Sequence, residues 1–335
     1  MIQKTDEPID AVYLWVDGQA PGFSAMLERV LSEEKAAPDA LSIGRDRFRD
    51  NEELRYSLRS LGTYAPWIRT VYIVTNGRAP TWLNMQHARI RVVTHDQLFL
   101  NPENLPSFNS QAIELQLHRI PGLSRRFLYL NDDVFFGRTC APSDFGVNDN
   151  AQRIYFQQTA LPYDPDNGPV HDRAYAFTQN LMEEQWPRMT DRRLPAHTPQ
   201  LYDKEVIAHL EGRFAEAFEQ TSQHRFRTPR DLVLRILYFF YLLEKSPLRC
   251  NHEAFVFEDT GPDYLFVRLL EDDPSAIQSL VKIARFRPRF FCINDDLGNV
   301  DISHQYLCAV RSLLAMMFPE RSSFELSPPT RTGSG

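Results

Sequence analysis

The sequence has few cysteines, no surplus of positive charge and no long apolar run, and each absence excludes a class of protein. Its four cysteines, Cys140, Cys250, Cys292 and Cys308, have no CxxC spacing, so we expect reduced thiols rather than disulfides or zinc ligands. The formal net charge of −7 argues against a nucleic-acid partner, which would require a basic face.

A membrane-spanning helix is not expected either. The longest strongly apolar segment, 232–243, is interrupted by Arg235 and is too short to span a bilayer. The first seven residues lack the apolar stretch of a signal peptide. We therefore expect a cytoplasmic protein, with peripheral attachment to the inner face of the membrane left open.

Strand and helix signals alternate over the first 150 residues. Short apolar runs typical of strands lie at 11–16, 71–74, 90–93 and 127–130. Apolar residues at helical spacing lie at 52–64 and 110–120. This alternation predicts an α/β fold, Rossmann-like, with a mostly parallel sheet.

The pattern changes after residue 150. Residues 157–200 are rich in Pro, Asp, Arg and Asn without periodicity, and they predict long loops that could form a lid. Helices are predicted at 202–219 and 229–244, and strand character returns at 289–293.

These patterns predict one catalytic domain, 1–326, followed by a disordered tail, 327–335. Within the domain, 9–150 should form a nucleotide-sugar-binding α/β core and 151–285 a loop and helical insertion that also serves as a lid. The segment 286–326 should return to the core.

Polar residues follow each of the four predicted strands, at 17–18, 76–77, 95–96 and 131–133. Ligands of parallel sheets bind outside the carboxyl ends of the strands, so four polar clusters at one edge predict a binding site. Asp132 and Asp133 are the most informative of these residues, because unpaired charge beside a buried strand is very unfavourable. Either a structural Arg or Lys or a hard divalent cation should compensate them, and we favour Mg²⁺ or Mn²⁺, which could carry a diphosphate.

The charged segment before the helix at 52–64 has two interpretations. Asp50 as N-cap and Glu53 three residues later would form a capping box. The neighbouring guanidiniums of Arg49, Arg55 and Arg59 instead suit a phosphate at a helix start.

Two later residues are candidates for catalysis. His197 lies in a rigid loop between two prolines, and its unperturbed pKa of ~6.5 would suit a general base. Arg227, in the run Arg-Phe-Arg, could clamp an anion, or the arginines of this run could pair with Asp231 or Glu219.

Together these motifs resemble the Stealth proteins, which are sugar-1-phosphate transferases. That family includes bacterial capsular polysaccharide phosphotransferases and the catalytic subunit of the lysosomal-enzyme N-acetylglucosamine-1-phosphotransferase. The resembling motifs are IDAVYLWVDG at 9–18, RDNEELRYSLRS at 49–60 continuing to YLNDD at 129–133, PAHTP at 195–199 with RFR at 225–227, and CIND at 292–295. Two departures occur: Gln19-Ala20-Pro21 stands where many members have Ser-Asp-Pro, and Thr198 replaces a Met.

The resemblance implies that an acceptor hydroxyl attacks the β-phosphate of a UDP-sugar and expels UMP. The transferred group would be a hexosamine-1-phosphate, the acceptor a capsular or exopolysaccharide glycan, and the protein could associate with a polysaccharide assembly complex at the membrane. Two alternatives stay open: a metal-dependent glycosyltransferase that releases UDP, and a non-catalytic nucleotide-sugar sensor.

The resemblance also implies roles for individual residues. Asp132 and Asp133 would hold the metal, Arg227 would contact the phosphate under attack, and His197 or Asp50 would be the base. We prefer His197, because a carboxylate with a pKa of ~3.9 is a weak base unless desolvated. The nucleotide sugar would be bound by Trp15, Asp17, Gly18, Arg49, Asn51, Arg55, Asn76, Gly77 and Asn109.

Overall fold

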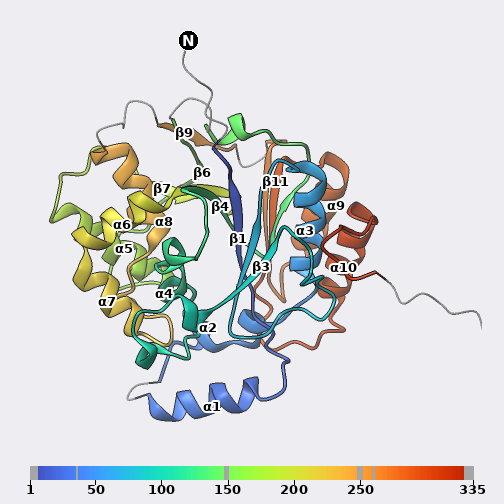
Figure 1. Cartoon of the computed structure of the whole chain (residues 1–335), viewed down its shortest axis with the longest axis horizontal. Helices are drawn as coiled ribbons and strands as arrows, with labels where there is room; N and C mark the ends of the chain where they lie inside the picture. Colours follow the sequence, from blue (N-terminus) through green and yellow to red (C-terminus); the bar gives the residue numbers. More distant parts are fainter. Residues whose placement is uncertain (1–6, 35–36, 147–150, 247–251, 259–260, 328–335) are drawn as a thin grey trace, which may run out of the picture.

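A five-stranded sheet with strand order β3-β2-β1-β4-β8 forms the centre of the molecule (Figure 1). The computed structural model describes residues 7–34, 37–146, 151–246, 252–258 and 261–327. The strands are β1 (Asp10–Leu14), β2 (Val71–Thr75), β3 (Ile90–Thr94), β4 (Arg126–Asn131) and β8 (Gln200–Asp203). The first four are parallel, and β8 runs antiparallel to β4. The predicted α/β class with a mostly parallel, Rossmann-like sheet is confirmed.

The two faces of this sheet are covered by different groups of helices (Figure 1). One face packs against α4 (Ser110–Glu114), α5 (Val170–Glu183), α6 (Lys204–Arg213), α7 (Ala215–Gln223) and α8 (Leu234–Phe240). The other face packs against α3 (Glu53–Tyr64), beyond which lie α9 (Ser275–Phe286) and α10 (Gln305–Met317). Strand β1 has side chains in the hydrophobic cores on both faces. Val12 packs into the core on the side of α4–α8, while Ala11 and Tyr13 pack into the core on the side of α3. A strand buried on both faces has to be apolar throughout.

Two smaller sheets flank the central one. The first has the order β10 (Tyr264–Leu269), β11 (Phe290–Asp295), β5 (Val134–Phe136), and the second β7 (Arg193–Pro195), β6 (Arg153–Ala160), β9 (Glu253–Val256). Strand β11 pairs with β5, which directly follows Asp133, and the Ile293 N–H donates to the Asp133 carbonyl at 3.1 Å. The end of β11 is thereby fixed beside the end of β4.

Helices α1 (Phe23–Glu33) and α2 (Ala40–Ile43) lie beyond the carboxyl ends of the parallel strands (Figure 1). Strand β1 is flanked by β2 on one side and β4 on the other. Strands β2 and β3 extend the sheet to one side of β1, and β4 is then added on the opposite side, so β1 marks a topological switch point. A crevice forms at such a point in open α/β sheets.

Several predicted elements are wrong in extent. The segment 157–200 contains α5, whose buried residues Ala174, Tyr175 and Met182 pack into the hydrophobic core. The helix predicted at 202–219 is two helices that meet at Phe214. The helix predicted at 229–244 begins only at Leu234, and its last turn is a π-helix, Tyr241–Lys245.

Other predictions concern the thiols, the membrane and the tail. Cys140, Cys292 and Cys308 are free thiols, as predicted, and Cys250 lies outside the described residues. Within the described ranges, no helix is long and apolar enough to cross a bilayer. The predicted disordered tail lies outside them too, apart from Ser327.

Candidate active site

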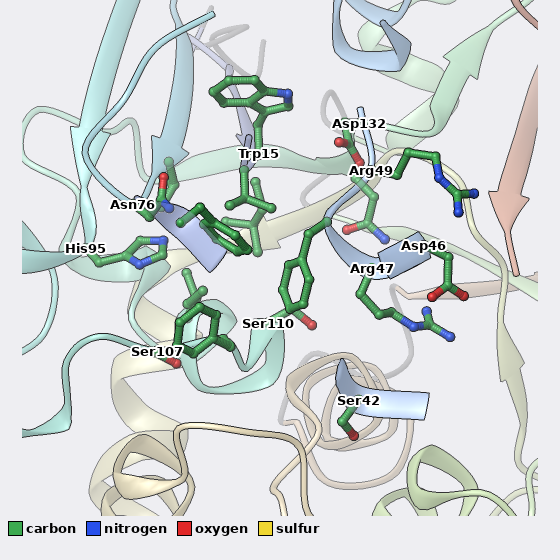
Figure 2. A pocket seen from close by; sticks show the side chains of 18 of the residues that line it. Trp15, Ser42, Asp46, Arg47, Arg49, Asn76, His95, Ser107, Ser110 and Asp132 are labelled. Atoms are coloured by element: carbon green, nitrogen blue, oxygen red, sulfur yellow. The ribbon is translucent and has the colours of Figure 1, made fainter. Parts of the chain in front are cut away.

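A cavity of about 460 Å³ opens at the carboxyl edge of the central sheet, where β1, β2 and β4 end (Figure 2). This volume lies within the ordinary range of small-molecule sites, ~300–1,000 Å³. The cavity has acidic, cationic and apolar walls, so it could accommodate a ligand with both charged and flat apolar parts.

Asp132 and Asp133 form the acidic wall directly after β4. Burial and the neighbouring carboxylate of Asp133 raise the pKa of Asp132 well above its usual range, and burial raises the pKa of Asp133. The Asp133 Oδ2 accepts long contacts from Cys292 Sγ at 3.3 Å and Asn294 Nδ2 at 3.4 Å. Its Oδ1 is buried without a hydrogen-bond partner within the described part of the chain.

This carboxylate pair fits a hard cation better than a structural Arg or Lys. Over the described residues, neither Asp132 nor Asp133 has an Arg or Lys nitrogen within ion-pair distance. The same residues contain no group of three His, Cys, Asp or Glu side chains that could hold a metal ion. A magnesium ion at this pair would therefore complete its shell with water and substrate oxygens, as Mg²⁺ commonly does.

Glu53 is a further acidic residue of the cavity, and the sequence pattern assigned it only to a capping box. That capping box is not formed, because α3 begins at Glu53 itself and Glu52 before it has a left-handed φ of 67°. Instead the Glu53 carboxylate accepts hydrogen bonds from the Asn51 backbone N–H at 2.5 Å and Nδ2 at 2.9 Å. Burial, with the nearby Asp50 charge, raises the pKa of Glu53 to about 8.

Asp50 itself does not line the cavity. Its Oδ1 accepts a hydrogen bond from the Glu52 N–H at 2.8 Å, which holds the turn before α3. Burial raises the pKa of Asp50 above its usual value, so it is a stronger base than an exposed carboxylate.

Arg47 and Arg49 form one side of the cationic wall (Figure 2). Arg49 donates to Asp295 Oδ2 at 2.6 Å, and Arg47 donates to Asp296 Oδ1 at 2.7 Å, so both are anchored by carboxylates at the end of β11. The sequence pattern pointed to Arg49 but not to Arg47, which belongs to the 3₁₀-helix Arg45–Phe48 directly before Arg49.

Arg227, predicted to contact the phosphate under attack, also lines the cavity, whereas Arg225 does not. The Arg227 guanidinium donates to Ser110 Oγ at 2.8 Å, and burial lowers its pKa. Arg225 donates to Glu33 Oε2 at 2.8 Å on the outer side of the segment. The chain bends at residues 225–226, and the two side chains therefore leave the segment in different directions.

Arg55 lies outside the cavity lining, in an ion-pair cluster. Its Nε donates to Glu325 Oε2 at 2.8 Å, and the Arg59 Nε donates to Glu325 Oε1 at 2.7 Å. Burial acts to raise the pKa of Glu325, but the hydrogen bonds from Arg59 and Arg55 lower it to about 2. These contacts fasten the C-terminal segment to α3.

Trp15 and Asn76, predicted to contact the nucleotide sugar, both line the cavity (Figure 2). His95, which follows β3, lines it as well, although it was not chosen from the sequence. Gly77 lies next to the lining with a φ of 113°, a conformation that a residue with a side chain rarely adopts.

Three other predicted contacts lie behind the lining. Gly18 is packed so closely that a Cβ atom would lie 2.3 Å from the Phe48 carbonyl oxygen. The Asp17 side chain accepts from a neighbouring backbone N–H at 2.9 Å. Asn109 caps α4 and donates to Asp231 Oδ2 at 2.8 Å. These residues shape loops around the cavity rather than facing it.

Three phenylalanine rings form the apolar wall: Phe23 and Phe48 have centroids 5.1 Å apart, Phe23 and Phe108 5.7 Å, and Phe48 and Phe108 6.0 Å. They come from three segments distant in the sequence. No local pattern marks them, and only the fold brings them together.

His197 does not line the cavity. Its ring stacks on Phe266 with centroids 4.9 Å apart, its backbone N–H donates to the Tyr264 hydroxyl at 3.1 Å, and its Nε2 lies 3.4 Å from Arg235 Nη1. Burial, with Arg235 second, lowers the pKa of His197 to about 3. The sequence had suggested an ordinary pKa, and the structure instead keeps this imidazole neutral.

Family models for three conserved regions match this chain: Stealth protein conserved region 2 over residues 47–154, conserved region 3 over 196–244 and conserved region 4 over 281–333. An exopolysaccharide phosphotransferase of Streptomyces coelicolor is 36% identical over 323 residues, which are 95% of this chain and 52% of the relative. The N-acetylglucosamine-1-phosphotransferase subunits alpha/beta of Homo sapiens are 50% identical over 144 residues, 42% of this chain and 11% of that protein.

The chain thus spans about half the length of the curated Streptomyces relative that it matches. Among solved structures, the galactosyltransferase LgtC in complex with donor and acceptor sugar analogs matches with a TM-score of 0.43 and 10% identity. That match covers 96% of this chain and 98% of LgtC.

Proposed function

The chain belongs to the Stealth family, and on this premise we propose that it transfers a sugar-1-phosphate from a UDP-sugar to a glycan hydroxyl, releasing UMP. The observation that carries the proposal is one cavity lined by both Asp132-Asp133 and the guanidinium of Arg227. Names of the relatives support exopolysaccharide synthesis and a hexosamine-1-phosphate as the transferred group.

The carboxylates of Asp132 and Asp133 are the proposed metal ligands. A bound Mg²⁺ or Mn²⁺ would neutralise the diphosphate and polarise the phosphoryl oxygens. The unpartnered Asp133 Oδ1 supports this role, because a buried oxygen without a partner lacks the compensation that a cation would supply. The raised pKa values of both residues are also consistent with it, since two buried carboxylates repel each other until a cation binds.

Arg227 and Arg47 are the proposed contacts for phosphate oxygens. In the reaction, the acceptor oxygen forms a bond to the β-phosphorus, and the bond from that phosphorus to the bridging oxygen of UMP breaks. Negative charge redistributes over the equatorial oxygens, where preorganised guanidiniums stabilise it. Arg49, which also lines the cavity, is anchored to Asp295 and would hold this cationic wall in place. A phosphate role for Arg55 stays a prediction.

The proton of the attacking hydroxyl passes to His197 or Asp50. His197 is neutral and half-buried on the helical side of the site, so its imidazole can accept a proton. Its imidazolium would lie beside Arg235, so proton acceptance needs the negative charge of bound substrate nearby. Asp50 is the second candidate because burial raises its pKa.

The remaining walls suit a nucleoside. We propose that Trp15, Asn76 and the rings of Phe48 and Phe108 enclose the uridine, since aromatic faces stack on flat bases. Asp17, Gly18, Gly77, Asn51 and Asn109 would act by holding these segments in place. Cytoplasmic location and peripheral attachment to a membrane assembly stay predictions.

The test is the identity of the nucleotide product. The purified chain is incubated with UDP-N-acetylglucosamine, Mg²⁺ and a panel of oligosaccharides, and nucleotides are separated by liquid chromatography. UMP together with a phosphodiester signal in the ³¹P spectrum supports the proposal. UDP would instead identify a glycosyltransferase, and donor binding without turnover over the whole panel would identify a sensor.

A matched pair of variants tests the site itself. Asp133→Asn should lower turnover by orders of magnitude because it removes a proposed metal ligand. Asp96→Asn removes an exposed carboxylate at the opposite, β3, side of the same cavity and should leave most activity. Equal activities of the two variants would contradict the assignment.

A further inference from the structure

A second group of polar side chains, one of them a guanidinium, lies on the helical side of the cavity. His171 and Tyr175 come from α5, and Arg235 comes from α8. We name these three residues the α5/α8 cluster. They do not line the cavity described above, but they adjoin His197, whose Nε2 is 3.4 Å from Arg235 Nη1. The cluster is therefore next to the proposed base.

Contacts within the cluster orient the Arg235 guanidinium. Its Nη2 donates a short hydrogen bond to the Tyr175 hydroxyl, and its Cζ lies 5.3 Å from the Tyr175 ring centroid. The His171 ring lies 5.9 Å from the same ring. His171 and Arg235 are half-buried, so both retain surface that a ligand could reach.

Among the described residues, the half-buried Arg235 differs from two buried arginines in having no carboxylate partner. Arg192 and Arg59 each have a glutamate oxygen at 2.7 Å. Over the described residues, no Asp or Glu oxygen lies within ion-pair distance of Arg235 or of Arg227. Desolvated charge without a counter-ion is unfavourable, so the site favours an anion supplied from outside.

Within the described residues, internal carboxylates do not form an ion pair with Arg235. Glu114 interacts electrostatically with both Arg235 and Arg227, and burial raises the pKa of its carboxyl above the usual value. Asp172 lies beside the cluster, where its Oδ1 is 3.3 Å from His171 Nε2 and so serves the histidine. The guanidinium of Arg235 has five N–H donors, of which the contacts to Tyr175 and His197 use two.

The position of Arg235 relative to the donor cavity indicates which substrate would carry the anionic group. Arg227 lies in the donor cavity and is available to the diphosphate, whereas Arg235 lies beyond it, on the side of His197. A group bound by Arg235 would thus belong to the molecule whose hydroxyl is deprotonated. We propose that the α5/α8 cluster is an acceptor subsite that binds an anionic group of the glycan, a carboxylate or a phosphodiester.

This inference rests on the proposed function, and it names the acceptor class. A planar guanidinium binds either group through two parallel hydrogen bonds. A carboxylate would come from a uronic acid residue. A phosphodiester would come from an earlier round of transfer, because each sugar-1-phosphate added leaves one in the product.

The experiment compares three acceptors that differ only in charge: a neutral disaccharide, its uronic acid counterpart and its hexose-phosphodiester derivative. The kcat/KM of the wild type should be at least tenfold higher for an anionic acceptor, since a charge-assisted hydrogen bond contributes roughly 10- to 100-fold. The two anionic arms show which source is preferred. Equal kcat/KM values for all three acceptors would overturn the inference.

Variants separate binding of the anion from positioning of His197. Arg235→Gln should remove the preference and leave kcat/KM for the neutral disaccharide within a few-fold of wild type. An equal loss for all three acceptors would mean that Arg235 acts only through His197, and it would overturn the subsite. His171→Gln should weaken the preference, while Arg173→Gln, a charge change on α5 whose Nε donates to the Pro165 carbonyl, should not.

Direct binding keeps the inference distinct from the proposed function. Titration calorimetry with the same three compounds should show tighter binding of an anionic one, which Arg235→Gln abolishes. If UDP rather than UMP is released, the proposed function fails while the subsite can still hold. If UMP is released but neutral and anionic compounds bind alike, the subsite fails alone.

Discussion

Substitution of Asp133 by Asn should make the metal-free protein more stable and the metal-bound protein comparatively less stable. In the wild type, Asp133 Oδ1 is buried without a partner among the described residues, next to the half-buried carboxylate of Asp132. An unsatisfied buried group destabilises by about 1–3 kcal/mol. Removing the charge should therefore raise the melting temperature in excess EDTA by ~2–6 °C, at about 2 °C per kcal/mol for a chain of this size.

Magnesium should reverse this order. A ligand present at 100 times its Kd stabilises the folded state by about 2.7 kcal/mol, and Asp133→Asn should lose most of that gain. Calorimetric melts of both proteins in EDTA and in a Mg²⁺ series test the reversal. Asp96→Asn, which changes an exposed carboxylate of the same cavity, should behave as the wild type in both conditions.

The pH dependence of stability independently checks whether the charges of Asp132 and Asp133 destabilise the metal-free protein. The folded-state pKa values of Asp132 and Asp133 are raised, so metal-free protein loses stability as pH rises from the unfolded value near 3.8 through the raised values. Asp133→Asn should flatten this slope. A variant that melts below the wild type in EDTA, or that gains as much from Mg²⁺, would refute the reasoning.

Glu325→Gln should destabilise the fold by ~3 kcal/mol, the scale for breaking a buried ion pair. Because the folded-state pKa of Glu325 is about 2, the wild type should keep this stability above pH 4.5 and lose it toward pH 2. Urea melts measure both effects, and an unchanged unfolding midpoint in the variant would contradict the prediction. His197→Ala should cut kcat by roughly 10²–10⁴ with donor KM little changed. Since the pKa of His197 is about 3, the pH profile of wild-type kcat/KM should show no acid limb at pH 6–7 that arises from His197. An acid limb at pH 6–7 that is present in the wild type and absent from His197→Ala would contradict the lowered pKa. Arg227→Lys should be badly impaired, while Arg225→Ala, which loses exposed hydrogen bonds to Glu33 and to the Glu103 carbonyl, should stay near wild type. The reverse ranking in steady-state kinetics would mean that the clamp is misassigned.

Features carried by contiguous residues could be read from the sequence. Four apolar strands alternating with helices identified the α/β class, and Asp132-Asp133 stood out because two carboxylates end a buried strand. These features depend on spacing of a few residues, so local pattern suffices.

Features that depend on distant partners could not be read in this way. Arg55 looks like a phosphate ligand in sequence, but Glu325, 270 positions away, binds it. Asn109 is paired with Asp231, 122 positions away, and so supports the cavity from behind. In helix α5 the mixed polar composition concealed a buried face that only packing against α8 reveals.

The sequence by itself therefore determined the α/β class, the family and the residues at the strand ends, because local periodicity and contiguous motifs carry that information. Only the tertiary structure decided which charged side chains are free to act. Folding commits Arg55 to Glu325 and brings Glu53 into the cavity. Among the residues that the structure describes, it leaves Arg235 and Arg227 without an Asp or Glu oxygen within ion-pair distance. Burial then shifts the pKa values of Glu53 and His197, since desolvation and neighbouring charge depend on three-dimensional contacts that no local motif encodes.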